Sequence, residues 1–258
     1  MKNLLAVFCL APFALLAQEN TNYDPDYNGD GCYTATDLLG LLPLFGSCGF
    51  ACGDPIFFDN YWYETVLISD QCWFAENLRT TVYADSTSIP EVTGNFAWVG
   101  LSTGARCDYE NNAFLADTYG RLYNWYAVDD VRGLCPSGWH VPTHDDWIDL
   151  LNYIASQGFV GINVGPALQS NTGWTGTDNF GFSALPGGFR SGDLGNTEPG
   201  SISGFFFNLG NQSTWWSSSL FGTNAARFWY IQPGNPYLAW YDEVPTFGFS
   251  VRCLKDAD

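Results

Sequence analysis

The sequence predicts an α+β fold of mostly antiparallel strands and long loops, with one or two helices. The stretches "YWYETVLI" (61–68) and "ARFWYIQ" (226–232) have the two-residue period of strands. Gly, Asn, Asp and Pro separate such stretches, which is typical of turns. Only "THDDWIDLLNYIAS" (143–156) has convincing helical spacing.

The expected helix begins after Thr143 and ends near Ser156. Thr143 suits the N-cap position, and Asp146, three residues later, can complete a capping box at the positive end of the helix dipole. Four apolar residues recur at i, i+3, i+4 and i+7 and form one stripe that predicts a buried face. This stripe consists of Trp147, Leu150, Leu151 and Ile154.

Both histidines of the chain, His140 and His144, fall at this point beside two carboxylates, so a metal centre or an acid/base pair has to be considered. Pro142 prevents one helix from running through both histidines, which places His140 on extended chain and His144 in the first helical turn. A zinc-protease motif also needs Glu after the first histidine, and Val141 stands there. We therefore interpret the cluster as a helix start.

Residues 1–17 resemble a cleaved secretory signal, with a basic Lys2 followed by an apolar run that ends at Ala17. No second stretch approaches the roughly 18 apolar residues needed to span a bilayer. We expect an exported protein, either secreted or in the cell envelope, with a calcium loop and linker at 18–54 and one domain at 55–258.

The formal charge of −18 argues against nucleic acid as a partner, because binding to phosphate needs a basic face. The same charge is compatible with calcium and with neutral sugars.

The stretch "DYNGDGCYTATDLL" (26–39) has the spacing of a calcium loop, with oxygen ligands at positions 1, 3, 5, 7, 9 and 12 and Gly31 at the sharp turn. It resembles one half of a dockerin, which normally carries two such repeats, so the single copy argues against a cohesin-like partner. The alternative is an acidic, solvated linker. The expected ligands are Asp26, Asn28, Asp30, the carbonyl of Cys32, Thr34 and Asp37.

Several blocks in one order resemble the Fibrobacter succinogenes major paralogous domain, over about Tyr61 to Asp256. They are "QCWFAENLRT", "GRLYNWYAV", "LCPSGWHVPT", "DDWIDLL", "FGFSALPGGFR", "WWSSS" and "GFSVRCLKD". "WHVPTHDDW" and "GFSVRC" also look like signatures of the formylglycine-generating-enzyme group. That second resemblance implies a C-type-lectin-like fold, in which the two ends of the domain meet in one sheet.

Seven cysteines remain once Cys9 is removed with the signal, and export predicts disulfides among them with one thiol left over. The positions of these cysteines beside the family blocks imply that Cys135 pairs with Cys253, and that Cys72 pairs with Cys107. Cys32, Cys48 and Cys52 would then share one bridge and the odd thiol.

We expect no enzyme and assign no catalytic residue. Oxidases of the formylglycine-generating group use a cysteine pair to bind copper, and no matching pair can be placed here. The chain has no G-x-S-x-G elbow. The adjacent acids Asp129 and Asp130, and likewise Asp242 and Glu243, would point to opposite faces of a strand and so could not converge on one glycosidic bond.

Eleven tryptophans invite two interpretations, a large core or platforms on which sugar rings stack. Most of them fall inside the family blocks, which favours the core. Trp215 and Trp216 are adjacent, so on a strand one faces inward and the other could be exposed.

These observations favour an exported, non-catalytic binding module for a glycan or a surface protein. Two alternatives stay open: a hydrolase or oxidase on a formylglycine-generating-enzyme-like scaffold, and a purely structural surface protein.

Overall fold

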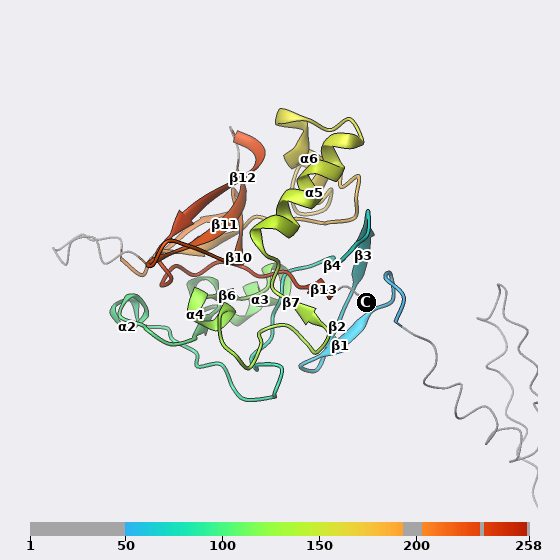
Figure 1. The fold of residues 1–258 in the computed structure, drawn as a ribbon. Coiled ribbons are helices and arrows are strands. Elements are labelled where there is room, and N and C mark those ends of the chain that lie inside the picture. Colours follow the sequence, from blue (N-terminus) through green and yellow to red (C-terminus); the bar gives the residue numbers. More distant parts are fainter. Residues whose placement is uncertain (1–49, 193–202, 233–234, 257–258) are drawn as a thin grey trace, which may run out of the picture. The chain divides into compact units, whose positions relative to one another are not determined.

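The computed structural model describes residues 50–192, 203–232 and 235–256 (Figure 1). Short strands in small sheets alternate with short helices, and all the described strand pairs are antiparallel, which confirms the α+β class. The strands are β1 (Ile56–Phe58), β2 (Tyr61–Tyr63), β3 (Thr65–Ile68), β4 (Gln71–Phe74), β5 (Arg106–Cys107), β6 (Leu122–Tyr123), β7 (Trp139–His140), β8 (Gly187–Arg190), β9 (Phe206–Leu209), β10 (Ser213–Phe221), β11 (Ala225–Gln232), β12 (Asn235–Glu243) and β13 (Leu254–Lys255). The α-helices are α2 (Asn95–Val99), α3 (Ala113–Tyr119), α4 (Trp125–Val128), α5 (His144–Ser156) and α6 (Val164–Leu168), with 3-10 turns at Tyr109–Asn111 and Gly161–Asn163.

Strands from near the two ends of the domain, β3 with β4 and β13, meet in a four-stranded sheet of order β3-β4-β13-β7, as the resemblance to lectin-like folds implied, whereas β1 and β2 form a separate sheet. Leu254 of the last strand lies opposite Trp73 of β4 on one side and His140 of β7 on the other. Figure 1 shows these early and late segments side by side. Residues far apart in the sequence therefore close the domain.

Helix α5 has the predicted bounds and the predicted cap. The Thr143 hydroxyl accepts a hydrogen bond from the backbone N–H of Asp146, and the Asp146 carboxylate accepts one from the backbone N–H of Thr143. Trp147 is fully buried and stacks on Trp229 of β11, with ring centroids 5.8 Å apart. The predicted apolar stripe is thus the face that packs on the β10-β11-β12 sheet.

The other four described α-helices were not predicted, so the expectation of one or two helices was too low. They have only four to seven residues each. Such lengths are too short for a hydrophobic period to develop, and most of their stability comes from packing. Local caps hold two of them: Asn112 accepts from Phe114 at the start of α3, and Asn124 accepts from Ala127 at the start of α4.

Two rows of aromatic rings cross the sheet of order β10-β11-β12. On one face Trp215, Trp229 and Trp240 lie opposite one another, and on the other face a row runs through Trp216, Phe228 and Tyr241. Trp215 and Trp216 are both fully buried, so the expectation that one of them could be exposed was wrong. The sheet is covered on both faces at β10, because Trp147 lies against Trp215 and Phe249 lies against Trp216.

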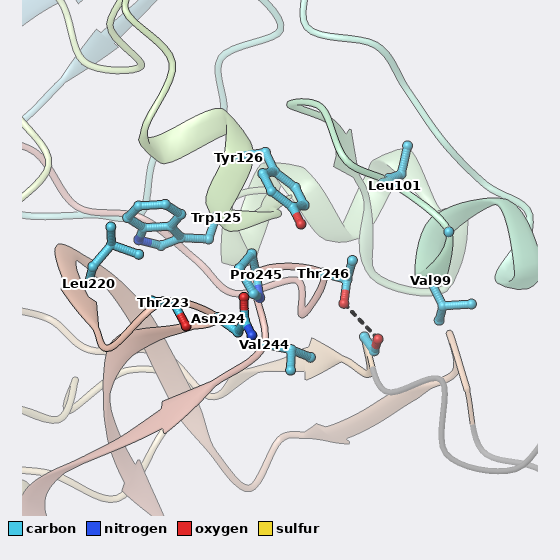
Figure 2. Close-up of a pocket in the computed structure, with 12 residues that line it drawn as sticks. Val99, Leu101, Trp125, Tyr126, Leu220, Thr223, Asn224, Val244, Pro245 and Thr246 are labelled. Atoms are coloured by element: carbon cyan, nitrogen blue, oxygen red, sulfur yellow. Dashed lines mark hydrogen bonds between the residues drawn. The ribbon is translucent and has the colours of Figure 1, made fainter.

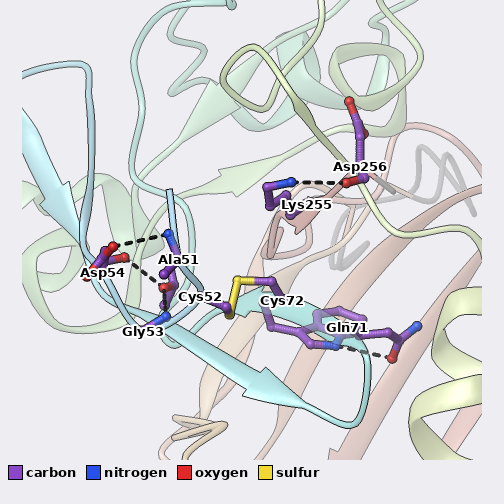
Figure 3. Close-up of a disulfide and its surroundings, with 10 residues drawn as sticks. Ala51, Cys52, Gly53, Asp54, Gln71, Cys72, Lys255 and Asp256 are labelled. Atoms are coloured by element: carbon purple, nitrogen blue, oxygen red, sulfur yellow. Dashed lines mark hydrogen bonds between the residues drawn. A yellow bond between two sulfur atoms is a disulfide. The ribbon is translucent and has the colours of Figure 1, made fainter. Parts of the chain in front are cut away.

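Cys135 is bonded to Cys253, the predicted pair, and this bridge closes a sequence separation of 118 residues. Cys72 is bonded to Cys52 and not to Cys107, which corrects the second predicted pair (Figure 3). Cys52 is held close to β4 because the Gly53 N–H donates to the hydroxyl of Thr65, on the neighbouring strand β3.

Cys107 is instead a free, buried thiol on β5, in a separate two-stranded sheet with β6. It belongs to a cluster around Trp98 and Leu122, away from the Cys72 cluster. Burial raises the pKa of the Cys107 thiol to about 12, so the thiol stays protonated at neutral pH.

Candidate functional site

The predicted calcium ligands Asp26, Asn28, Asp30, Cys32, Thr34 and Asp37 lie outside the described residues. Within residues 50–192, 203–232 and 235–256, no group of three or more His, Cys, Asp or Glu side chains is placed to hold a metal ion. The candidate sites of the described domain are therefore its clefts and its exposed aromatic rings.

His140 lies between two carboxylates. Its Nδ1 is 2.6 Å from Asp256 Oδ1 and its Nε2 is 3.3 Å from Asp146 Oδ2. Since ionised carboxylates only accept, both contacts are hydrogen bonds only when the imidazole carries two N–H groups and a positive charge. The hydrogen bond to Asp146 raises the pKa of His140 in spite of its partial burial. His140 thus joins β7 to the start of α5 and to the residue after β13.

His144 has different neighbours. Its ring stacks on Trp229 at 5.3 Å and meets Trp240 edge-on at 5.2 Å, and its backbone N–H donates to Ser219. Burial, followed by the charge of Arg227, lowers the pKa of His144. The structure therefore confirms that these histidines flank a helix start, one among carboxylates and one among indoles.

The adjacent acids are partnered in part by arginines. Asp130 lies 2.7 Å from Arg132, whose hydrogen bond lowers the pKa of the Asp130 carboxyl. Asp242 lies 3.0 Å from Arg227. In both cases a neighbouring guanidinium already uses the carboxylate.

An open cleft of about 550 Å³ lies where α4, the turn between β10 and β11 and the segment after β12 meet (Figure 2). The end of α2 and Gly192 complete its lining. Trp125 fixes the wall formed by α4: its backbone N–H donates to Pro245 O at 2.8 Å, and its indole N–H donates to Ser217 O at 3.0 Å. The hydroxyl of Thr246 donates to Gly192 O at 2.7 Å and ties the opposite side.

The lining of this cleft mixes apolar and polar residues, and none of its twelve residues carries a formal charge. The side chains of Tyr126, Thr223 and Asn224 make no hydrogen bond within the described part of the chain, and Thr223 and Asn224 are exposed. Two hydroxyls and one amide are thus available to a ligand that displaces water from the apolar side chains of the lining.

A smaller cavity of about 320 Å³ lies beside the Cys135–Cys253 bridge and is bordered by His140, Thr143 and Ser218. Two of its polar side chains are already engaged: His140 pairs with carboxylates, and the Thr143 hydroxyl completes the helix cap. It offers less free hydrogen-bonding capacity than the larger cleft.

Eight of the eleven tryptophans are buried, which confirms the core interpretation for most of them. Two rings stand apart: Trp62 on β2 is 59% exposed and Trp240 on β12 is 44% exposed. These two are the tryptophans that remain available for stacking on a ligand.

Sequence reasoning missed the cleft residues. Tyr126 lies within the block "GRLYNWYAV", which carried only the family resemblance, and Thr223 and Asn224 lie in the turn "FGTNAA". The turn itself was a readable signal, because Gly, Thr and Asn between two strand patterns predict a hairpin with exposed polar side chains. Nothing local indicated that α4 would face this turn.

In the described residues, no helix has both the length and the apolar character required to cross a bilayer.

Comparison with characterised proteins returned no match, and comparison with solved structures likewise returned none. Comparison with protein families matched residues 66–255 to the Fibrobacter succinogenes major domain. This match covers well over half of the 258 residues and includes both the cleft walls and the sheet that closes the domain. The chain therefore belongs to the Fibrobacter succinogenes major domain family.

Proposed function

We propose that this chain is an exported, non-catalytic binding module with a C-type-lectin-like architecture, and that the cleft beside α4 takes a neutral saccharide. The meeting of the domain ends in the β3-β4-β13-β7 sheet supports the architecture. The two disulfides support export, because such bonds persist in oxidising compartments. Residues 1–17 would serve as the cleaved signal.

The observation that carries the ligand class is the uncharged cleft, in which unpartnered polar groups lie beside apolar side chains. Tyr126, Thr223 and Asn224 can exchange hydrogen bonds with sugar hydroxyls, and the edge of Trp125 and the side chain of Leu220 can contact the apolar face of a sugar ring. An acidic polymer would in addition be repelled by the formal charge of −18.

The chemistry of the lining supports binding without catalysis. The twelve lining residues include no carboxylate, histidine, lysine or cysteine that could act as general acid, base or nucleophile. Of the described cysteines, four are in disulfides and Cys107 is buried, which gives no support to a copper-binding pair.

The test is binding of the purified full chain to an array of neutral glycans, followed by titration calorimetry with a bound glycan. Tyr126→Phe and Asn224→Ala should each weaken binding about ten-fold, because each removes hydrogen bonds to the ligand. Tyr237→Phe is the matched control: Tyr237 is 45% exposed and lies outside the cleft, so its affinity should equal that of the parent.

Three outcomes would contradict this proposal or favour an alternative. Equal affinity in parent and cleft variants would remove the ligand from the cleft. Release of shorter glycans or oxidised products during incubation would favour the hydrolase or oxidase. Neither binding nor turnover would favour a structural surface protein.

A further inference from the structure

Arg227 of β11 is held between two aromatic rings on the three-stranded sheet. Its guanidinium carbon lies 4.3 Å from the ring centroid of Trp240 and 5.2 Å from that of Phe221. Its Nε donates to Asp242 Oδ1 at 3.0 Å. We refer to Phe221, Arg227, Trp240 and Asp242 as the arginine platform.

The arginine platform lies on the sheet face opposite the cleft. Leu220 lines the cleft and the next residue, Phe221, belongs to the platform, and adjacent residues on a strand point to opposite faces. Arg227 lies directly opposite Asp242 in the ladder between β11 and β12, so their side chains share one face. The cleft and the platform are consequently separate surfaces of the same hairpin.

The platform has unused capacity for hydrogen bonding. The two Nη groups of Arg227 make no hydrogen bond within the described residues, and neither is among the fully buried nitrogens without a partner, so both keep some contact with solvent although the side chain is only 16% exposed. The rings beside them are partly exposed: Trp240 is 44% exposed although Arg227 lies over its ring and His144 meets it edge-on, and Phe221 is 54% exposed. Stacking on both rings and the bond to Asp242 hold these donors in a fixed orientation before any ligand arrives.

We propose that the arginine platform is a second binding site for a neutral saccharide, which presents vicinal hydroxyls to Arg227 and Asp242 and stacks a ring face on Trp240. A hydroxyl both donates and accepts, and the platform offers donors on Arg227 beside an acceptor on Asp242. Sugar C–H groups can pack on the exposed parts of the two aromatic rings.

The charges of the platform select the ligand class. Asp242 neutralises Arg227 at 3.0 Å, so the local site has no net positive charge to attract an anion. The formal charge of −18 on the whole chain repels acidic polymers. A neutral sugar needs no positive charge at the site and is not repelled by the acidic chain.

A purely structural role for the same residues is the competing explanation. In that case Arg227 would only brace the hairpin through its ion pair and its ring contacts, and the site would bind nothing. The two explanations differ in ligand stoichiometry, because only a binding site adds a bound molecule.

The experiment is titration calorimetry of the full chain with neutral trisaccharides of glucose, galactose, mannose and xylose, and with a galacturonate trimer. Ligands this short cannot reach both faces of the sheet. The parent should bind two molecules of one neutral trisaccharide, and Arg227→Lys or Asp242→Asn should leave one, with platform affinity reduced about ten-fold or more. Arg227→Lys keeps the charge and loses the planar fork, and Asp242→Asn keeps the shape and loses the anionic acceptor.

Trp62→Ala and Asn224→Ala are the controls. Trp62 is also a half-exposed tryptophan, but it lies on β2, so its loss should leave two bound molecules. Asn224→Ala affects the cleft, so one molecule should remain on the platform. Tryptophan fluorescence of Asn224→Ala should still respond to the sugar, and that of the Asn224→Ala, Trp240→Phe double variant should not.

Several results would overturn the platform. The first two are two molecules bound by both platform variants, and a loss of bound sugar in Trp62→Ala equal to that in the platform variants. The others are tighter binding of the galacturonate trimer than of any neutral trisaccharide, and no binding by the parent. One molecule that disappears in Asn224→Ala would overturn the platform and leave the cleft standing. One molecule that disappears only in the platform variants would support the platform and contradict the cleft.

Discussion

The guanidinium of Arg252 lies 3.9 Å from the ring centroid of Phe182 and donates a hydrogen bond to the backbone carbonyl of that same residue. Arg252 is 1% exposed, and it also donates to Ser183 O at 3.1 Å and to Asn77 Oδ1 at 3.2 Å. Burial lowers the pKa of the guanidinium to about 9, which still leaves it charged at neutral pH. Carbonyl oxygens and an aromatic face compensate the buried charge, and Arg252 thereby joins its own segment to two others, around Asn77 and around Phe182.

We expect Arg252→Lys to destabilise the domain by about 2–4 kcal/mol. Lysine keeps the charge but lacks the planar fork that reaches several carbonyls at once, so buried acceptors lose their partners. Urea unfolding of parent and variant measures the difference. Arg132→Lys is the matched control, because the Arg132 side chain is 38% exposed and solvent screens its ion pair with Asp130, so its urea midpoint should stay close to that of the parent. Equal midpoints for Arg252→Lys and the parent would contradict the stabilising role.

The disulfide pattern predicts unequal losses of stability. The Cys135–Cys253 bridge closes 118 residues and the Cys52–Cys72 bridge closes 20, so removal of the first should cost about 5 kcal/mol and removal of the second about 3 kcal/mol. Double serine variants, Cys135→Ser with Cys253→Ser and Cys52→Ser with Cys72→Ser, compared by denaturant unfolding, measure both values. A larger loss from the shorter loop would contradict the entropic explanation.

Peptide mapping under non-reducing conditions should recover both linked pairs, and Cys107 should resist alkylation in the folded protein. Its thiol is buried and its pKa is raised to about 12, so little thiolate forms at neutral pH. Denaturation in urea should expose it to the reagent. Rapid alkylation of Cys107 without denaturant would show that this part of the fold opens.

The two histidines should contribute opposite slopes to the dependence of stability on pH. The raised pKa of His140 gives stability that is fully present below its unfolded pKa of about 6.5 and is lost as pH rises through the folded value. The lowered pKa of His144 gives stability that is present above about 6.5 and is lost as pH falls through the folded value. Urea unfolding between pH 5 and pH 8 is the measurement.

Glutamine variants separate these contributions. His140→Gln should remove the decline in stability towards high pH, and His144→Gln should remove the decline towards low pH. Asp146 affects the acid end, because hydrogen bonds from His140 and Thr143 overcome its burial and lower its pKa. Its contribution is lost as pH falls through that lowered value, below the range tested. The same slope in both glutamine variants would refute the assignment.

Calcium should bind the N-terminal loop with a dissociation constant on the order of 10⁻⁴ to 10⁻³ M, the range of extracellular calcium modules. Asp26, Asp30 and Asp37 supply three carboxylates. Calorimetric titration of the full chain should give calcium heat that Asp30→Ala and Asp37→Ala abolish and that Asp70→Ala, an exposed acid in the domain, leaves unchanged. No heat in the parent would favour an acidic linker.

Local patterns in the sequence determined the elements whose signals lie close together. Thr143 and Asp146 cap α5, and the apolar stripe that begins at Trp147 selects its buried face, so the helix could be predicted from fourteen consecutive residues. Strand β11 was likewise readable from its two-residue period. The blocks that resemble the family also predicted that strands from the two ends of the domain share a sheet and that Cys135 pairs with Cys253.

Only the tertiary structure decided which distant residues meet. Cys72 pairs with Cys52 because the chain before β1 returns to β3, and no spacing between cysteines encodes that approach. Trp216 is buried because Phe249 covers its face of the sheet, although alternation along β10 allowed it to be exposed. The cleft joins residues from Val99 to Thr246, so it exists only after long-range packing sets α4 against the β10–β11 turn. Periodicity and capping act within a few turns of chain, whereas disulfide partners, burial on a second face and clefts depend on contacts between segments that folding brings together.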